Sequence, residues 1–481
     1  MQEQERVGGS PVTVRPVEFA RVLGLWDATA IVAGSMIGSG IFLVSADIAR
    51  QVQAPAYLLG VWVLTALLTI LGALTYGELA AMMPRAGGQY VYLREAYGSL
   101  VGFLYGWTLF TVIQTGTIAA VAVAFARFTA VLFPWLESTP AGAFSLDRQR
   151  VLAIAVIALL TWANTTGIHT GRWVQNIFTA GKVGALLLLI VLGALFAPVR
   201  GAGTVNWQWF WGKEEISLLV LLPAFGAAMV GALFSADAWN NVTFAAAEVR
   251  RPERTVPLSL VLGAAGVTGL YVLANVVYLA ILPLWGEAQA AAVLERGIAH
   301  ASHDRVATAA MEVLFGPTGT WMMALAIMLS TFGCANGLIL AGARVYHAMA
   351  HDGLFFRVAG YLNTRRVPGA ALVMQGVWAS LLVLSGTYSD LLDYVIFAAL
   401  LFYALTAGAV FVLRVREPER PRPYRALGYP WLPALYILLT SAILVDLLVM
   451  KPRYTWPGLG LVVAGVPVYL LARRSLGDRR I

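Results

Sequence analysis

Long apolar runs separated by short polar segments dominate the chain. A helix needs roughly 20 mostly apolar residues to cross a bilayer, and many of these runs approach or reach that length. They do not alternate between polar and apolar positions as the strands of a membrane barrel do. The pattern therefore predicts membrane-spanning helices, which satisfy their own backbone hydrogen bonds in lipid. The predicted spans are 24–48, 57–82, 98–133, 150–167, 174–197, 217–246, 258–283, 307–350, 369–386, 391–413, 430–450 and 457–472.

Composition excludes a soluble protein. Hydrophobic residues make up 59% of the 481 and charged residues 12%, whereas soluble domains carry roughly 25% charged residues. The first twenty residues lack the apolar core of a signal peptide. The single cysteine, Cys334, lies within an apolar run, so no disulfide framework is expected.

The net charge of +8 is best explained by membrane topology. With a cytoplasmic N-terminus, the inside segments hold 21 Lys and Arg residues and the outside segments hold 9. This asymmetry follows the positive-inside rule. We therefore expect both termini on the cytoplasmic side of a cell membrane, and the basic excess requires no nucleic-acid partner.

Two predicted spans carry unusual central sequences. The first contains Gly34-Ser-Met-Ile-Gly38-Ser-Gly40-Ile-Phe42, and the sixth contains Phe234-Ser-Ala-Asp237-Ala-Trp-Asn240-Asn241. Each segment opens a block of five spans. Interrupted segments at corresponding positions of two halves indicate the binding site of a secondary transporter.

The first of these segments suits a carboxylate. Glycine and serine weaken the helix, and glycine allows a ligand to approach the backbone closely. Free amides at the start of a half-helix carry partial positive charge. The alternative is a packing seam of small residues, which the spacing of Gly34 and Gly38 also fits.

The second segment places an acid within a span. Asp237 would be costly in lipid, and carboxylates in such positions usually face a cavity. Together with unwound carbonyls it could receive an ammonium group. Alternatively, Asp237 caps a half-helix or pairs with Asn240 or Asn241. Phe234 is a candidate lid over the site, although aromatic residues also serve in ordinary packing.

Other polar residues within or near the spans have two explanations each. Lys182 lies about eight residues into the fifth span, where it either extends toward the interface or holds the broken first helix as a fixed cation. His347 and His351 have a spacing that can present metal ligands. They lack a convincing third ligand, so no metal site is predicted. Glu78 is interpreted as part of a structural ion pair, with a proton relay as the alternative.

With these residues in view, the chain resembles members of the amino acid–polyamine–organocation superfamily over nearly its whole length. It is most similar to the prokaryotic relatives of the L-type amino acid transporters. The order of several short motifs carries the resemblance. These are Gly38-Ser-Gly-Ile-Phe42, Tyr76-Gly-Glu-Leu, Pro84-Arg-Ala-Gly-Gly-Gln-Tyr90, Val174-Gln-Asn-Ile-Phe178, Ala180-Gly-Lys182, Asp237-Ala-Trp-Asn240, Glu248-Val, Pro252-Glu, Ser330-Thr-Phe-Gly333, Ala335-Asn-Gly337 and Arg422-Pro-Tyr-Arg425.

The resemblance implies an all-α membrane fold of about twelve helices. It is the LeuT-type inverted repeat of five plus five helices followed by two more, with the first and sixth helices broken at mid-membrane. The expected parts are an N-terminal tail (1–21), two five-helix repeats (22–200 and 215–415), a final helix pair (428–473) and a C-terminal tail (474–481).

The resemblance also implies roles for individual residues. Amides around Ser39 and Gly40 would hold the substrate carboxylate, and the ammonium would meet carbonyls near Met36, Phe234 and Asp237. Phe234 would match the gating aromatic of the family. Lys182 would match the lysine that stands in for a sodium ion, which implies sodium-independent transport, frequently by exchange. No cofactor is implied.

The sequence departs from the family near the sixth-span acid, where many relatives carry tyrosine and glycine and this chain has Ala236 and Ala238. The substrate is therefore open. Asp237 would favour cationic amino acids or would serve only the backbone ammonium. Animal relatives attach to a glycoprotein through a cysteine after the third span, and residues 134–149 contain none. A disulfide-linked partner is therefore not expected.

These observations lead to the hypothesis of a secondary amino acid transporter that works by alternating access and exchange. Proton-coupled symport is the alternative within this class. An integral-membrane enzyme would need convergent nucleophile, base or metal ligands, and no convincing set is present. A channel is the remaining alternative, and unsaturable conductance would distinguish it.

Overall fold

The computed structural model describes residues 21–137, 146–166, 171–212, 217–365, 367–385 and 388–477, with the backbone alone for 171–176 and 472–477. Within this part of the chain the architecture is a bundle of helices, and the single β-bridge joins Leu23 to Val249. Most of the predicted N-terminal tail (1–21) and the last residues of the predicted C-terminal tail (474–481) lie outside the described residues.

The predicted apolar runs correspond to helices throughout the described chain. In chain order the principal helices are α1 (Leu25–Met36), α2 (Gly40–Leu43), α3 (Ser45–Val52), α4 (Pro55–Met82), α5 (Gln89–Tyr97), α6 (Ser99–Thr108), α7 (Gln114–Leu132), α8 (Arg148–Thr165), α9 (Gly171–Arg200), α10 (Thr204–Gln208), α11 (Leu218–Ser235), α12 (Pro252–Ile281), α13 (Val293–Arg296), α14 (Val306–His351), α15 (Gly369–Ser385), α16 (Tyr388–Arg416), α17 (Trp431–Met450) and α18 (Pro452–Gly477). Short irregular helices are the π-helical turn η1 (Leu109–Ile113) and the 3₁₀ segments η2 (Pro134–Leu136), η3 (Trp239–Glu248), η4 (Ser302–Asp304) and η5 (Arg357–Gly360).

Nine helical segments of the described chain are long and apolar enough to cross a membrane. The three other predicted spans correspond to α1–α3, α8 and α15, so the total of twelve remains a prediction. The unusually long eighth span is α14, whose backbone is non-helical at Gly316 (φ 63°, ψ −152°). Glycine tolerates this geometry because it has no Cβ.

Corresponding helices of the two predicted repeats pack against each other. The second and seventh predicted spans meet as α4 and α12, the third and eighth as α7 and α14, and the fourth and ninth as α8 and α15. This is the pairing that an approximate two-fold relation between the halves would give. The predicted repeat boundaries themselves stay a prediction.

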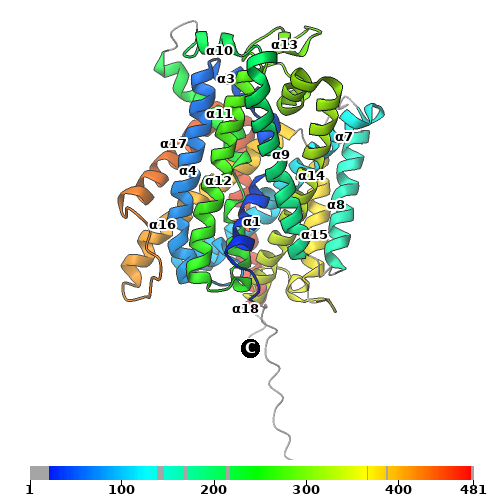
Figure 1. The fold of residues 1–481 in the computed structure, drawn as a ribbon. Coiled ribbons are helices and arrows are strands. Elements are labelled where there is room, and N and C mark those ends of the chain that lie inside the picture. Colours follow the sequence, from blue (N-terminus) through cyan, green and yellow to red (C-terminus); the bar gives the residue numbers. More distant parts are fainter. Residues whose placement is uncertain are drawn as a thin grey trace, which may run out of the picture.

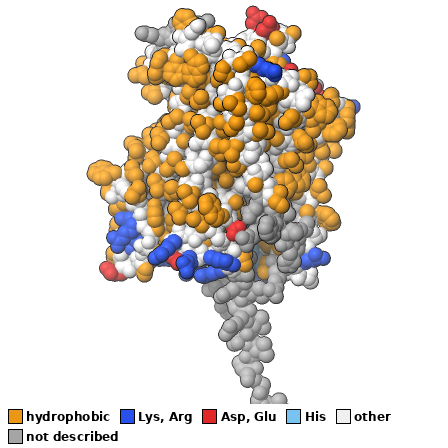
Figure 2. Space-filling model, viewed as in Figure 1, with side chains coloured by type: hydrophobic (Ala, Val, Ile, Leu, Met, Phe, Trp, Pro, Cys, Tyr) orange, Lys and Arg blue, Asp and Glu red, His pale blue; other side chains and the backbone are white. Residues whose placement is uncertain are grey.

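The two ends of the bundle differ. One end carries α3, α10 and α13, and is called here the α13 end; the opposite end carries the described C-terminus and is called the terminal end. Figure 2 shows a broad hydrophobic surface between the ends, with Lys and Arg side chains gathered along the terminal end. Apolar side chains such as Leu219, Val191 and Leu195 are exposed, as expected for contact with lipid.

Candidate functional site

Helices are interrupted at both places that the glycine-rich and polar clusters indicate. The first interruption lies between the end of α1 at Met36 and the start of α2 at Gly40. The second lies between the end of α11 at Ser235 and the 3₁₀ segment η3, with Ala238 in the left-handed region at φ 62°. These are called the first break and the second break.

Side chains from three other helices satisfy the carbonyls that end α1. The last carbonyls of a helix lack partners within it. Here Lys182 Nζ of α9 donates to the Gly34 oxygen at 2.7 Å, and the Cys334 thiol of α14 donates to the Ser35 oxygen at 3.3 Å. Tyr271 of α12 donates to the Met36 oxygen at 3.0 Å. These specific contacts therefore stabilise the interruption of the helix at the first break.

The two breaks touch each other. The Tyr271 hydroxyl also lies 3.1 Å from the Ser235 carbonyl, so a single side chain bonds both breaks. A Cβ added at Gly40 would lie 2.1 Å from the Ser235 Oγ atom. The backbones therefore approach to a distance that only glycine permits at position 40.

Lys182 points into the bundle. Its side chain is buried, with 1% of its surface exposed, so it does not extend to the interface. A buried ammonium group requires strong partners because desolvation is costly. The Gly34 carbonyl supplies one, which places a fixed positive charge against the end of α1.

Asp237 bonds to a tyrosine of the second repeat. The Tyr403 hydroxyl of α16 donates to Asp237 Oδ1 at 2.6 Å, whereas the sequence had offered Asn240 and Asn241 as partners. A polar chain continues from there. Asn240 Nδ2 donates to Gln89 Oε1 at 2.7 Å, and Gln89 Nε2 donates to Thr406 Oγ1 at 3.0 Å.

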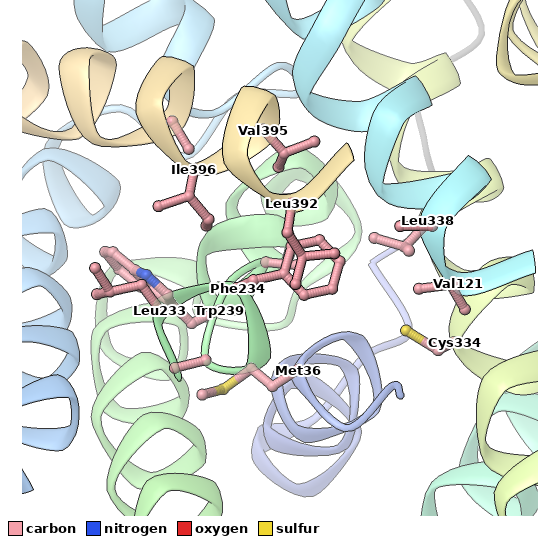
Figure 3. Close-up of a cluster of buried hydrophobic side chains, with 14 of the residues drawn as sticks. Met36, Val121, Leu233, Phe234, Trp239, Cys334, Leu338, Leu392, Val395 and Ile396 are labelled. Carbon is pink, nitrogen blue, oxygen red and sulfur yellow. The ribbon is translucent and has the colours of Figure 1, made fainter. Parts of the chain in front are cut away.

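Phe234 lies in an aromatic and apolar cluster beside the first break. Its ring stands edge-on to the ring of Tyr388, with 6.1 Å between centroids. The Tyr388 hydroxyl lies 3.0 Å from the Ser39 Oγ atom. Figure 3 shows Phe234 among Met36 of α1 and Leu392 of α16. Phe234 thus connects the second break to the first through Tyr388.

The site is closed in this conformation. Met36, Ser39, Phe234 and Asp237 are each less than 8% exposed, and Gly40 is buried as well. Two small cavities border Asp237, with volumes of about 20 and about 10 Å³. Each has room for about one water molecule. An amino acid can therefore reach the breaks only after helices move apart.

The remaining candidates from the sequence lie away from the breaks. Glu78 forms the expected ion pair, accepting from Arg414 at 2.9 and 2.6 Å. The rings of His347 and His351 pack against each other with centroids 4.5 Å apart. The described residues contain no group of three His, Cys, Asp or Glu side chains that could hold a metal ion.

Four residues of this region were not identified from the sequence, namely Tyr271, Tyr388, Tyr403 and Arg127. Tyr271, Tyr388 and Tyr403 lie in ordinary apolar helices, where a tyrosine gives no local signal of a polar role. Arg127 of α7 lies within the third predicted span, and its guanidinium carbon is 5.4 Å from the centre of the Tyr388 ring. The rarity of arginine within a span was the one signal that could have found it.

Comparison with known proteins agrees with this architecture. Residues 23–466 match the profile of the family described as amino acid permease. The human large neutral amino acids transporter small subunit 2 is 30% identical over 472 residues, covering 95% of this chain and 81% of the relative. The human b(0,+)-type amino acid transporter 1 is 29% identical over 443 residues, covering 92% and 85%. The chain thus belongs to the amino acid permease family and is a multi-pass membrane protein.

Proposed function

We propose that this protein is a secondary transporter that exchanges amino acids across a cell membrane by alternating access, without sodium. The observation that carries the proposal is the contact between Lys182 Nζ and the Gly34 carbonyl at 2.7 Å. In the related LeuT-type architecture a sodium ion holds the broken first helix. A permanently attached ammonium group at that place removes the need for the ion.

The substrate would bind where the two breaks meet. Amides at Ser39 and Gly40 open a helical run and have no acceptor within it, so they suit the carboxylate. The ammonium would meet carbonyls near Met36, Phe234 and Asp237. The Met36 oxygen already accepts from Tyr271, but a carbonyl oxygen can accept a second hydrogen bond.

Alternating access requires the closed site to open toward each side in turn. Phe234 is the proposed gate, since its ring covers the first break together with Tyr388. The packing of α4 with α12, α7 with α14 and α8 with α15 supports two inverted five-helix repeats. In this proposal twelve helices cross the membrane, and the repeats move against each other around the breaks.

The charge distribution supports the orientation of the bundle. Lys and Arg side chains gather along the terminal end in Figure 2. The positive-inside rule then assigns the terminal end to the cytoplasm and the α13 end to the outside. The single cysteine of the sequence, Cys334, is buried, so the proposal includes no disulfide-linked partner.

The side-chain preference follows from the same site. The names of the two human relatives denote large neutral amino acids and b(0,+)-type amino acid transport. In this chain Asp237 is engaged by Tyr403. We propose that Asp237 serves the backbone ammonium and that neutral amino acids are the main substrates, with cationic ones as the alternative.

Proton-coupled symport is the second candidate. A buried carboxyl group, Asp237, has a single hydrogen-bond donor in Tyr403 among the described side chains and borders two water-sized cavities. Such a group could take up and release a proton during transport.

Transport by purified protein in sodium-free proteoliposomes separates these possibilities. Each of the twenty amino acids competes with labelled alanine, leucine or arginine, in empty and in preloaded vesicles. Uptake that requires preloading supports exchange. Uptake into empty vesicles under an acid-outside gradient would favour symport, and no uptake under either condition would contradict transport of amino acids.

A further inference from the structure

Arg127 is linked to the first break by one side chain, Tyr388, which contacts both. Its guanidinium carbon lies 5.4 Å from the centre of the Tyr388 ring, within the range of a cation–π contact. The hydroxyl of that tyrosine lies 3.0 Å from Ser39 Oγ, and its ring meets Phe234. Arg127 is on α7, near the end of the helix that leads to the α13 end. It is therefore next to the proposed carboxylate site, on the outer side of the gate.

Nearby cations at this end have carboxylate partners. Arg50 bonds to Asp304 at 2.8 Å and also lies 3.5 Å from Asp47. Arg305 lies 3.0 Å from Glu137. These two arginines thus pair with Asp304, Asp47 and Glu137.

Arg127 has no such partner. Within the described chain its guanidinium makes no ion pair and donates no hydrogen bond, and its side chain is partly buried. Asp304 is near enough to interact with it electrostatically, but that carboxylate is bonded to Arg50. Of these three arginines, Arg127 is the one whose guanidinium contacts no carboxylate within the described chain.

A partly buried guanidinium without a carboxylate is costly to maintain. Its planar arrangement of N–H groups matches a carboxylate and can donate two parallel hydrogen bonds to it. A cation–π contact with tyrosine supplies weaker compensation, about 0.5–2 kcal/mol. An arriving carboxylate would therefore displace the Tyr388 ring from the guanidinium.

We propose that Arg127 is the first binding site for the substrate carboxylate as it arrives from the α13 end. This inference rests on the proposed transport function and adds a step to it. Once the carboxylate engages Arg127, the Tyr388 ring leaves the guanidinium. Movement of Tyr388 also breaks its hydrogen bond to Ser39, which frees the first break to receive the carboxylate.

The charge of Arg127 has a consequence for selectivity. Substrates with an additional carboxylate are attracted to Arg127, whereas those with a cationic side chain are repelled. The effect of Arg127 on binding should therefore be confined to one side of the membrane and should depend on the charge of the substrate. A residue that only supports the fold would show neither property.

Exchange kinetics of Arg127→Gln in sided proteoliposomes test the inference. We expect the KM at the α13 side to rise about tenfold for a neutral amino acid, equivalent to about 1.4 kcal/mol. The maximal rate and the KM at the terminal side should change less than about twofold. The effect should be largest for anionic substrates, smallest for cationic ones, and weaker at high ionic strength because salt screens the charge.

Two further variants keep the test interpretable. Arg148→Gln removes the same charge from an exposed position at the same end, and its KM should remain that of the unmodified protein. If Arg127→Gln fails to fold, Arg127→Met retains the apolar stem and replaces it in the same measurement.

Three results would overturn the inference: an unchanged KM at the α13 side, an equal rise on both sides, or a rise independent of substrate charge. A protein whose unmodified form transports no amino acid would overturn the proposed function itself. The two failures are therefore distinguishable.

Discussion

The Tyr271 hydroxyl lies 3.0 Å from the carbonyl oxygen of Met36, at the point where α1 ends. The Ser235 carbonyl at the end of α11 lies 3.1 Å from the same hydroxyl, so the two carbonyls share its one proton. A single polar atom thus connects the two interrupted helices. The geometry of the proposed substrate site depends on α12, which contributes no group assigned to the substrate.

Replacing Tyr271 by Phe should loosen both breaks. The change leaves two buried carbonyls without this donor, which should lower the free energy of unfolding by about 1–3 kcal/mol. We also expect the KM for the substrate to rise severalfold, because the carbonyls near the ammonium lose their fixed positions. Thermal unfolding and exchange kinetics measure the two effects. Tyr278→Phe is the matched control, since its hydroxyl lies at a longer distance, 3.3 Å, from the Ile41 carbonyl. Equal effects of the two substitutions would contradict the special role of Tyr271.

Lys182→Met should reduce sodium-free exchange by about tenfold or more. The substitution keeps the length of the side chain but removes the charged donor to the Gly34 carbonyl. Hydrogen bonds of charged groups contribute about 1.5–3 kcal/mol, so the first break should lose its fixed geometry. Initial rates in preloaded vesicles give the measurement. Full activity of the variant without sodium would show that the lysine does not replace the ion.

Gly40→Ala should abolish transport through a steric clash. The new Cβ would lie 2.1 Å from Ser235 Oγ, 2.8 Å from its Cβ and 3.0 Å from its Cα. The double variant Gly40→Ala with Ser235→Gly removes the first two contacts, so we expect it to recover part of the exchange rate. Rates of both variants and of Ser235→Gly alone complete the comparison. A double variant no better than Gly40→Ala would mean that Gly40 acts through something other than its approach to Ser235.

The surroundings of His303 predict that the stability of the protein depends weakly on pH. Its ring Nε2 lies 3.0 Å from Glu137. Burial lowers the pKa of His303, and the nearby Arg305 cation lowers it further, against the opposing effect of Glu137. The unfolded chain therefore binds the proton more readily than the folded protein. Stability should then fall as the pH drops below the unfolded pKa of about 6.5.

His303→Gln should remove this part of the pH dependence. Thermal unfolding between pH 7.5 and about 5, with His300→Gln as control, measures it. A steeper loss of stability in the variant than in the unmodified protein would contradict the assignment.

Much of the fold follows from the sequence because lipid imposes strict demands. Each apolar run must form a helix to satisfy its backbone, so the segment containing α12, for example, is readily predicted. The breaks were also predictable. Glycines such as Gly40 and the acid Asp237 disfavour an uninterrupted helix in lipid.

The contacts around the breaks could not be predicted in the same way. Tyr271 and Tyr403 gain their roles from helices distant in sequence, and nothing in their own segments indicates which carbonyl or carboxylate they meet. For Asp237 the sequence left a helix cap or pairing with Asn240 or Asn241 as alternatives to a substrate role, and it gave no sign of the hydrogen bond from Tyr403. Residues of α16 reach the site through the packing of helices that are distant in sequence, as Tyr403 does with Asp237.

The exchange stoichiometry of purified protein tests the central claim most directly. Sodium-free vesicles contain one labelled amino acid, and a second, differently labelled amino acid is added outside. We expect one molecule released for each molecule taken up, and neither movement when the opposite side is empty. Release that proceeds without external amino acid, or uptake into empty vesicles at an equal rate, would contradict exchange through the site formed by the two breaks.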